Sequence, residues 1–353
     1  MISAGFSCRR AKREAPHEHD ALMRRSLLAR FLLARLGWAI PVILAILIVN
    51  FLIIHIVPGD PIQALIGDFP APPGYADQIR HEFGLDQPVL TQLGLYLLNL
   101  AKGQLGFSFA NRQPVLGLIL QRAQFTLILM LPALALAASL GIVMALAAAP
   151  RAGSLYDSGL TALSLVGFSL PIFWLGQLLV IMFAIKLHLL PAQGMFSLRT
   201  RLTGWPYVLD VLWHLILPMF AVTIYYVAIV ARVARASVLD ALSQDFVLTA
   251  KAKGLSRRRV LWRHVLPNAL IPVVTVIGYN FGYSLTGAIL VETVFAWPGL
   301  GNLFITSIGN RDYPVLQGIF LLTAIAVVIA NVATDLVYAS LDPRVRSTGL
   351  RHA

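Results

Sequence analysis

The residues of this chain best able to do chemistry are clustered cations. Residues 245–270, which read DFVLTAKAKGLSRRRVLWRHVLPNAL, are the longest polar and basic interruption between strongly apolar segments. Arg257, Arg258 and Arg259 would open a helix, where like charge at the positive end of the helix dipole is unfavourable. Helix stability therefore does not explain them. An anionic neighbour does, either lipid phosphates or an acidic partner surface.

Two short helices should carry these cations. Ser243 can cap the first helix, and Asp245 lies in its first turn, where an acid suits the dipole. Lys251 and Lys253 lie in its last turn, where cations are favoured. Gly254 should end the helix, because glycine readily adopts the left-handed conformation that closes a helix.

The glycine stop should be compact. We expect Leu255 to fold back onto Ala250 in a Schellman-type cap, and a second helix to start at Ser256. The small residues Ala250, Ala252 and Gly254 leave one face of the first helix open to close approach. The stretch is therefore interpreted as a docking element.

The basic stretch also allows two other interpretations. A basic helix–turn–helix can bind DNA, but residues 225–233 and 271–290 are apolar enough to anchor both of its ends in a membrane. Alternatively, it is a plain cytoplasmic loop whose arginines only fix the topology of the protein.

Signatures of catalysis are missing from the sequence. No Gly-x-x-x-x-Gly-Lys-Ser/Thr motif is present, so the chain cannot hold nucleotide phosphates in a P-loop. It also has no paired histidines at metal spacing, no Gly-x-Ser-x-Gly elbow and no intramembrane pair of carboxylates. We therefore expect no catalytic residue, no metal site and no enzymatic activity of its own.

Ion-coupled transport is also disfavoured. Such transporters place ionisable groups near the middle of the membrane, whereas His55, Lys186, His188 and Asp335 fall near the ends of apolar segments. The single Cys8 excludes an internal disulfide.

The composition identifies an all-α polytopic membrane protein. Hydrophobic residues make up 58% of the chain, charged residues only 12%, and the mean hydropathy is +0.76. The net charge of +12 then reflects basic loops that orient the protein in the membrane. About six transmembrane helices are expected. They are residues 38–57, 125–149, 160–187, 215–233, 273–291 and 315–338.

The segments around these spans give the predicted domain organisation. We expect residues 1–22 to form a polar, disordered extension and translation to start naturally at Met23. Residues 23–122 hold the first span and an external segment whose residues 76–100 suit helices at the membrane interface. Residues 123–345 form the main transmembrane domain with the cytoplasmic loop 239–270, and residues 346–353 form a tail. Lysines and arginines concentrate in the loops on one side of the predicted spans. Because such loops stay in the cytoplasm, this asymmetry predicts that both termini are cytoplasmic.

Two features suggest a pathway and close helix contacts. Pro171, in SLPIFWLG, should tilt or kink the third span, and kinks often line pathways, although Pro171 could instead only ease packing. Gly278, Gly282 and Gly287, with Ser284 and Thr286, leave room on one face of the fifth span for a close helix neighbour. The candidate pathway residues are Ser169, Pro171, Phe173, Trp174, Asn280, Ser284 and Thr286.

The motifs resemble one family throughout. Leu248-Thr249-Ala250, Gly254 and Val265-Leu266-Pro267 occupy the places of the Glu-Ala-Ala pattern, the glycine and the Leu-Pro of the EAA coupling loop in permease subunits of binding-protein-dependent ABC importers. The stretch is most similar to the dipeptide, oligopeptide and nickel branch, in which the leading glutamate is usually absent. The likeness extends from Met23 to the final DPR. It includes PGDP, GLDQP, SLPIFWLG, HLILP, GAILVETVFAWPGLG and RDYPVLQG.

This resemblance implies a fold, partners and a substrate class. The fold is that of a type I ABC importer permease in the cytoplasmic (inner) membrane. The partners are a second homologous permease, two ATPase subunits that bind ATP-Mg, and an external substrate-binding protein. This chain itself binds no cofactor and no nucleic acid. Dipeptides or short oligopeptides are the expected substrates, and nickel and glutathione are the alternatives.

The resemblance also implies site residues. Glu292, Trp297, Pro298 and Arg311, in an external loop, are candidates for contact with the binding protein. The candidate ATPase-coupling residues are Asp245, Thr249, Ala250, Lys251, Ala252, Lys253, Gly254, Leu255, Arg257 and Pro267.

Overall fold

The computed structural model describes residues 37–53, 55–56, 74, 81, 86–108, 110–198 and 202–341 of the chain, without the side chains of 283–287 and 339–341. The predicted N-terminal extension, the start at Met23, and the tail 346–353 lie outside the described residues.

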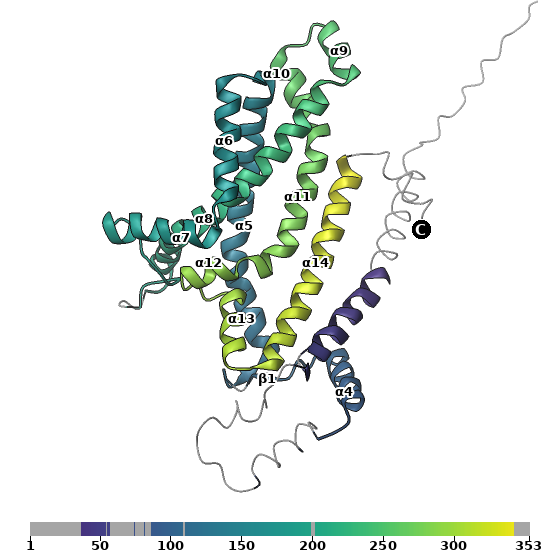
Figure 1. Cartoon of the computed structure of the whole chain (residues 1–353), viewed down its shortest axis with the longest axis vertical. Helices are drawn as coiled ribbons and strands as arrows, with labels where there is room; N and C mark the ends of the chain where they lie inside the picture. The colour runs from purple at the N-terminus through teal and green to yellow at the C-terminus, as the bar shows by residue number, and fades with distance from the viewer. Residues whose placement is uncertain are drawn as a thin grey trace, which may run out of the picture.

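The described part is a bundle of helices with one small hairpin (Figure 1). Strands β1 (Phe107–Ser108) and β2 (Gln113–Pro114) pair antiparallel, with Ser108 opposite Gln113. The predicted all-α membrane class is confirmed. The helices are Gly37–Ile53, α4 (Val89–Ala101), α5 (Val115–Ala148), η1 (Ala149–Arg151), α6 (Leu155–Ser169), α7 (Ile172–Leu179), η2 (Val180–Lys186), α8 (Trp205–Leu242), α9 (Asp245–Ala252), α10 (Arg257–Val260), η3 (Leu261–Val265), α11 (Leu266–Gly287), α12 (Ile289–Val294), α13 (Leu300–Gly309) and α14 (Tyr313–Leu341).

Four of the described helices are long and apolar enough to cross a membrane, and a bent pair adds a fifth candidate span. The four are Val115–Arg151, Trp205–Leu242, Arg257–Gly282 and Tyr313–Tyr338. At the place of the expected first span lies the shorter apolar helix Gly37–Ile53, of 17 residues. Five of the six predicted spans are therefore long enough to cross a membrane, if the bent pair counts as one span, and the first is represented by this shorter helix.

The kink expected at Pro171 in the third span is confirmed, and it is sharp enough to divide the span into separate helices. Helices α6 and α7 meet at an angle of 97°. Leu170 adopts an extended backbone with ψ of 126°, a conformation favoured for it because the ring of Pro171 disfavours the helical conformation of the residue before it. Pro132, Pro218 and Pro272 lie inside helices that continue past them. Proline alone therefore did not predict the break.

Close approach through small residues holds the long helices together. A Cβ on Gly141 of α5 would come within 2.7 Å of the Val230 side chain of α8. A Cβ on Gly278 of α11 would overlap the Thr334 hydroxyl of α14, and one on Gly282 would lie 3.3 Å from Val327 of the same helix. The predicted role of Gly278 and Gly282 is confirmed, and α14 is the neighbour they accommodate.

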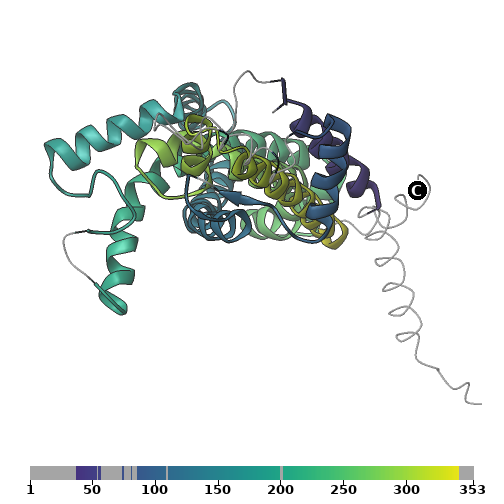
Figure 2. The same ribbon diagram turned by 90° about the horizontal axis from the view of Figure 1, so that it is seen from below.

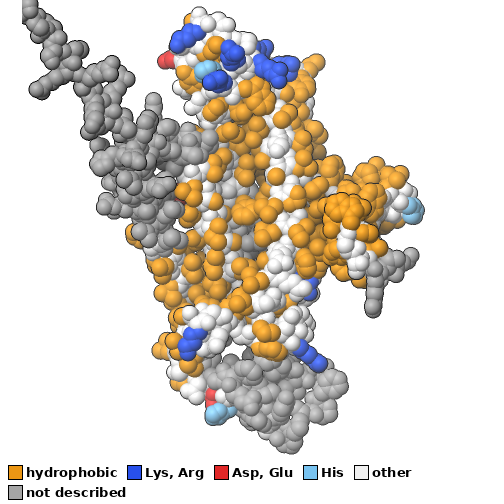
Figure 3. Space-filling view, turned by 180° about the vertical axis from the view of Figure 1, so that it is seen from behind, with side chains coloured by type: hydrophobic (Ala, Val, Ile, Leu, Met, Phe, Trp, Pro, Cys, Tyr) orange, Lys and Arg blue, Asp and Glu red, His pale blue; other side chains and the backbone are white. Residues whose placement is uncertain are grey.

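The surface of the bundle is largely apolar. Figure 3 shows hydrophobic side chains over most of the visible length of the molecule, with lysines and arginines gathered at its two ends. A membrane protein has this distribution because charged side chains are costly in the hydrocarbon layer.

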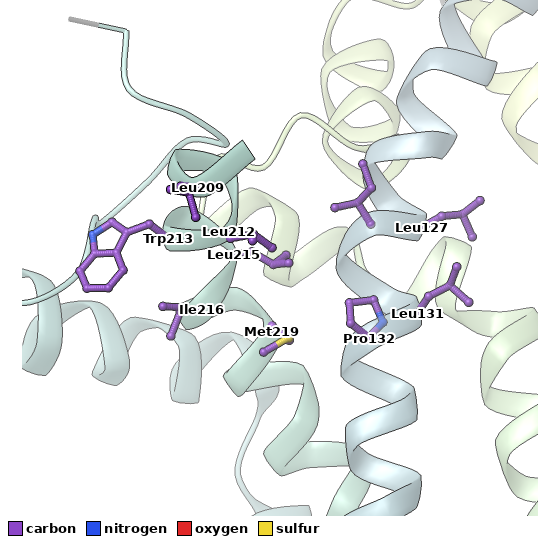
Figure 4. A pocket seen from close by; sticks show the side chains of 10 residues that line it. Leu127, Leu131, Pro132, Leu209, Leu212, Trp213, Leu215, Ile216 and Met219 are labelled. Atoms are coloured by element: carbon purple, nitrogen blue, oxygen red, sulfur yellow. The ribbon is translucent and has the colours of Figure 1, made fainter. Parts of the chain in front are cut away.

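A lobe formed by α7, η2 and the beginning of α8 projects sideways from the bundle (Figure 2). Where α8 turns back toward α5, an apolar groove of about 730 Å³ lies between the two helices. Leu131 and Pro132 of α5 and Leu212, Trp213 and Met219 of α8 line it, and Pro132 points from α5 toward α8 (Figure 4). Apolar side chains are exposed both on η2 and on the beginning of α8.

Candidate coupling site

The basic stretch forms a compact projection at one end of the bundle (Figure 1). Helices α9 and α10 and the π-helical turn η3 build it, between α8 and α11. We call residues 243–265 the knob.

The entry to the knob differs from the expectation for Ser243. Helix α8 runs to Leu242 and does not end near residue 233, so Ser243 becomes its C-cap, and the Ser243 hydroxyl donates to the Asp240 carbonyl at 2.7 Å. Gln244, in an extended conformation, takes the N-cap position of α9. The prediction that Ser243 caps α9 is wrong, because two residues separate the helices: Ser243 is the C-cap of α8 and Gln244 is the N-cap of α9.

The glycine stop is confirmed in detail. Gly254 has φ of +75°, the left-handed conformation. The Gly254 N–H donates to the Lys251 carbonyl at 2.9 Å, and the Leu255 N–H to the Ala250 carbonyl at 3.3 Å. These are the two hydrogen bonds of a Schellman cap. Ser256 then takes the N-cap position of α10, as predicted.

An apolar face fixes the knob to the bundle. Val247 and Val265 are completely buried, and Ala250 and Val260 nearly so. They form one cluster with residues of α5, η1, α8 and α11, namely Leu146, Ala149, Val238, Ala241 and Ala269. A load applied to the knob is therefore transmitted to three long helices through close packing.

Burial of Ala250 corrects one expectation. Ala250 is only 5% exposed and faces the bundle, whereas Ala252 and Gly254 are exposed. The three small residues do not form one open face, because positions two apart lie on opposite sides of a helix. An arginine at position 250 would disrupt the packing inside the knob.

The outward face of α9 is formed by Asp245, Leu248, Thr249 and Ala252, all exposed. Their spacing of three and four residues places them on one side of the helix. Leu248, 63% exposed, gives this face an apolar centre, and Lys251 and Lys253 lie beside it. Figure 3 shows this end rich in lysine and arginine. Such a face is complementary to a groove with an apolar floor and an acidic rim.

The arginines of α10 divide into two roles. Arg257 donates from Nη2 to the Pro150 carbonyl of η1 at 2.7 Å, so it ties the knob to the end of α5. Arg258 and Arg259 are exposed, as is Pro267 in the first turn of α11. The expectation of an anionic neighbour therefore rests on Arg258 and Arg259.

An ion pair near the base of the knob was missed in the sequence. Arg235 of α8 donates from Nε and Nη2 to the two carboxylate oxygens of Asp157 in α6, at 2.5 and 2.6 Å. Asp157 is buried and also accepts the Gly153 N–H at 3.0 Å. The Ser154-x-x-Asp157 spacing, a helix-capping pattern, was the available signal, since Ser154 caps α6.

The pathway candidates come from the break between α6 and α7 and from α11. Phe173 and Trp174 are about two-fifths exposed on α7, next to Pro171. Ser169 and Asn280 each donate to a carbonyl of their own helix, at 2.8 and 2.6 Å. The side chains of Ser284 and Thr286 lie outside the description. Their role as pathway residues stays a prediction.

A buried lock lies toward the other end of the bundle, around Glu292 of α12. Its carboxylate accepts the Thr126 hydroxyl of α5 at 2.6 Å, the Gly301 N–H at 2.7 Å and the Asn302 N–H at 3.1 Å. Thr126 accepts the Leu300 N–H in turn, at 2.8 Å. Three N–H groups that the start of α13 leaves free are thereby satisfied, which joins α5, α12 and α13.

This lock changes the expectation for the external loop. Glu292 and Trp297 are completely buried, and the Trp297 indole donates to the Phe125 carbonyl at 2.8 Å. Their side chains face the interior, so they are unavailable for contact with an external protein. The Pro298 carbonyl accepts a hydrogen bond from Arg122, whereas Arg311 is exposed. A binding-protein contact stays a prediction for Pro298 and Arg311.

Within the part of the chain that the structure describes, no group of three or more His, Cys, Asp or Glu side chains is arranged to hold a metal ion. The two polar groups described above, around Glu292 and around Asp157, instead join helices to one another.

These features define a polytopic helical membrane protein, and comparison with known proteins gives its family. The sequence pattern of the binding-protein-dependent transport system inner membrane components matches residues 137–347. The pattern of the N-terminal part of such membrane components matches residues 28–130. The chain belongs to this family.

Its relatives cover nearly the whole chain. It is 38% identical to the di/tripeptide transport system permease protein DppB of Pseudomonas aeruginosa, over 90% of this chain and 98% of that protein. It is also 38% identical, with the same coverage, to the dipeptide transport system permease protein DppB of Escherichia coli. A putative peptide transport system permease protein of Brucella melitensis is 39% identical over 91% of this chain and 99% of that protein.

Proposed function

We propose that this chain is the permease subunit of an ATP-driven importer that carries dipeptides or short oligopeptides across the cytoplasmic membrane. The substrate class rests on the peptide permeases it resembles over nine-tenths of its length. The neutral character of the pathway candidates is compatible with it. A pore edged by hydroxyl and amide groups would pass many different side chains without holding any of them.

The observation that carries the coupling role is the knob. It combines a buried apolar face against α5, α8 and α11 with an exposed face that bears Leu248 beside Lys251 and Lys253. In the proposed mechanism an ATPase subunit receives this outward face. Closure of two ATPase subunits around ATP-Mg moves the knobs of two permease subunits together, and the attached helices rock the pathway from one side to the other. This chain itself binds no cofactor.

The proposed orientation follows from charge. The knob end would face the cytoplasm together with both termini, because lysine and arginine concentrate in cytoplasmic loops. The opposite end, with Pro298 and Arg311, would face the binding protein. A second homologous permease would complete the translocation pathway.

Two exposed residues of α9 test the coupling role. Leu248→Glu and Ala252→Glu place acid on the outward face without touching the buried face, so both variants should reach the membrane normally but lose ATPase copurification. Leu155→Glu is the matched control, since Leu155 is 93% exposed outside the knob. Equal copurification of the ATPases with the α9 variants and the wild type would refute the proposal. Equal loss with Leu155→Glu would also refute it.

Competition uptake tests the substrate class. Cells with and without this subunit would be offered labelled dipeptide, a longer peptide, glutathione and nickel. Loss of peptide uptake alone supports the proposal, and loss of nickel or glutathione uptake with all peptides unaffected overturns it.

A further inference from the structure

A second groove lies at the end of the bundle away from the knob. Its volume is about 660 Å³, and helix Gly37–Ile53 forms one wall while α13 and α14 form the other. The walls are apolar, with Ile46 and Val49 on one side and Phe304, Leu316 and Phe320 on the other. We call it the α14 groove. Its volume falls in the range of about 300–1,000 Å³ found for sites that hold one small organic ligand.

Two buried polar groups line this apolar groove. The Asn50 side chain is only 6% exposed, and its Nδ2 has no hydrogen-bond partner among the described residues. The Tyr313 hydroxyl is also buried and has no partner within the described ranges. An unsatisfied buried donor is costly, so such groups are normally paired. Both can donate, which points to a ligand that carries acceptor oxygens.

A cation lies at the same end of the groove. Arg311 lines it, is exposed, and occupies the turn between α13 and α14 with φ of +52°. The turn is fixed by hydrogen bonds from the Arg311 N–H to the Ile308 carbonyl, at 3.2 Å, and from the Tyr313 N–H to the Arg311 carbonyl, at 2.9 Å. The neighbouring Asp312 is buried. Its Oδ2 accepts the Ser108 hydroxyl, whereas its Oδ1 has no hydrogen-bond partner among the described residues.

We propose that the α14 groove binds one membrane phospholipid. One acyl chain lies between Val49 and Phe320, ester carbonyl oxygens accept from Asn50 Nδ2 and the Tyr313 hydroxyl, and the phosphate meets the Arg311 guanidinium. The order of these groups from apolar wall to cation matches the order of groups in the lipid. Because α14 starts at Tyr313 and runs toward the knob end, Arg311 lies at the headgroup level of the leaflet opposite the knob (Figure 1).

The test uses the purified permease and ATPase complex without the binding protein, so that a role of Arg311 in binding-protein contact does not enter. The complex is reconstituted in nanodiscs that contain spin-labelled phosphatidylglycerol, and the motionally restricted lipid is counted. Val49→Trp fills the groove. Its control is Ile329→Trp, which adds the same side chain at a position of α14 that is 59% exposed and does not line the groove.

The phosphate contact has its own matched pair. Arg311→Gln removes the groove cation, and Arg112→Gln removes another exposed arginine that also has φ of +52°. We expect one restricted lipid fewer per chain for Val49→Trp. For Arg311→Gln we expect about fivefold weaker retention of that lipid, the effect of losing about one phosphate attraction at a membrane surface. The two control variants should match the wild type.

Several outcomes would overturn the proposal. Unchanged lipid counts for both Val49→Trp and Arg311→Gln would do so. So would equal losses in each variant and its control. A disulfide or crosslink from a cysteine at Phe320 to the second permease subunit, in good yield, would show that protein fills the groove.

Discussion

Replacing Glu292 tests whether the buried lock stabilises the bundle. Glu292→Ala removes the acceptor of the Thr126 hydroxyl and of the Gly301 and Asn302 N–H groups. Two of these hydrogen bonds, from Thr126 and Gly301, are fully buried, and an unpaired buried donor costs about 1–3 kcal/mol. The expected loss in the free energy of unfolding is therefore about 2–6 kcal/mol, before any cost of the cavity.

The lock should also respond to pH. Burial raises the pKa of Glu292 to about 7 from an ordinary value of 4.5, against hydrogen bonds from Thr126, Asn302 and Gly301 and the charge of Arg122. A raised pKa means that the folded protein holds the proton more tightly than the unfolded chain. The resulting stabilisation is complete below about pH 4.5 and is lost as the pH rises through about 7. The difference corresponds to about 3 kcal/mol.

The assay is thermal unfolding of the purified complex, followed by tryptophan fluorescence at pH 5, 7 and 8.5. Glu292→Gln keeps the shape but cannot titrate, so it should lose the part of the pH dependence that lies between 5 and 8.5. Glu292→Ala should unfold at lower temperature at every pH. Asp245→Asn, an exposed carboxylate of the knob, is the control and should leave the pH profile unchanged.

Two results would refute this reasoning. One is a Glu292→Ala variant as stable as the wild type within about 1 kcal/mol, half of the smallest cost expected from two orphaned donors. The other is a Glu292→Gln variant whose pH profile matches that of the wild type.

Three further predictions concern coupling, packing and topology. Gly254→Val places a branched side chain at φ of +75°, which costs about 1–3 kcal/mol of backbone strain. ATPase-coupled uptake should therefore fall at least tenfold while membrane insertion persists. Normal uptake would contradict the requirement for a rigid knob. A double-mutant cycle of thermal stability would compare Asp157→Ala, Arg235→Ala and the double variant. The coupling energy should exceed about 1 kcal/mol, because the ion pair is bidentate and the carboxylate is buried. Additive effects of the two substitutions would contradict this. In a background without the native cysteine, an impermeant thiol reagent applied to intact cells should label a cysteine at Gly74 and leave one at Ser256 unlabelled, and the reverse pattern would invert the topology.

The sequence alone determined the class of protein and the local design of the knob. Apolar composition and span length specify a helical membrane protein, because backbone groups in a bilayer must pair within the segment. The glycine stop was equally predictable. Gly254, flanked by Ala250 and Leu255, contains the whole Schellman cap within six residues, and its hydrogen bonds in the structure are local.

Tertiary structure decided which residues the knob turns inward. The pattern of small residues suggested an open face at Ala250, but packing in one cluster with residues of α5, α8 and α11, among them Leu146 and Val238, buries it. Helix length also depends on such packing. Helix α8 continues past its apolar part to Leu242. Ser243 therefore lies at the C-terminal end of α8 and does not begin α9.

The lock and the break in the third span needed the whole fold. Glu292 looked like a residue of an external loop because it follows an apolar span, yet Thr126, 166 residues earlier, and the start of α13 enclose its carboxylate. Pro171 breaks its helix, whereas Pro132, Pro218 and Pro272 remain within theirs, although each removes the same backbone donor. Sequence fixes the local cost of a proline or a carboxylate. The neighbours that tertiary packing supplies decide whether that cost is met by bending the chain or by pairing the group.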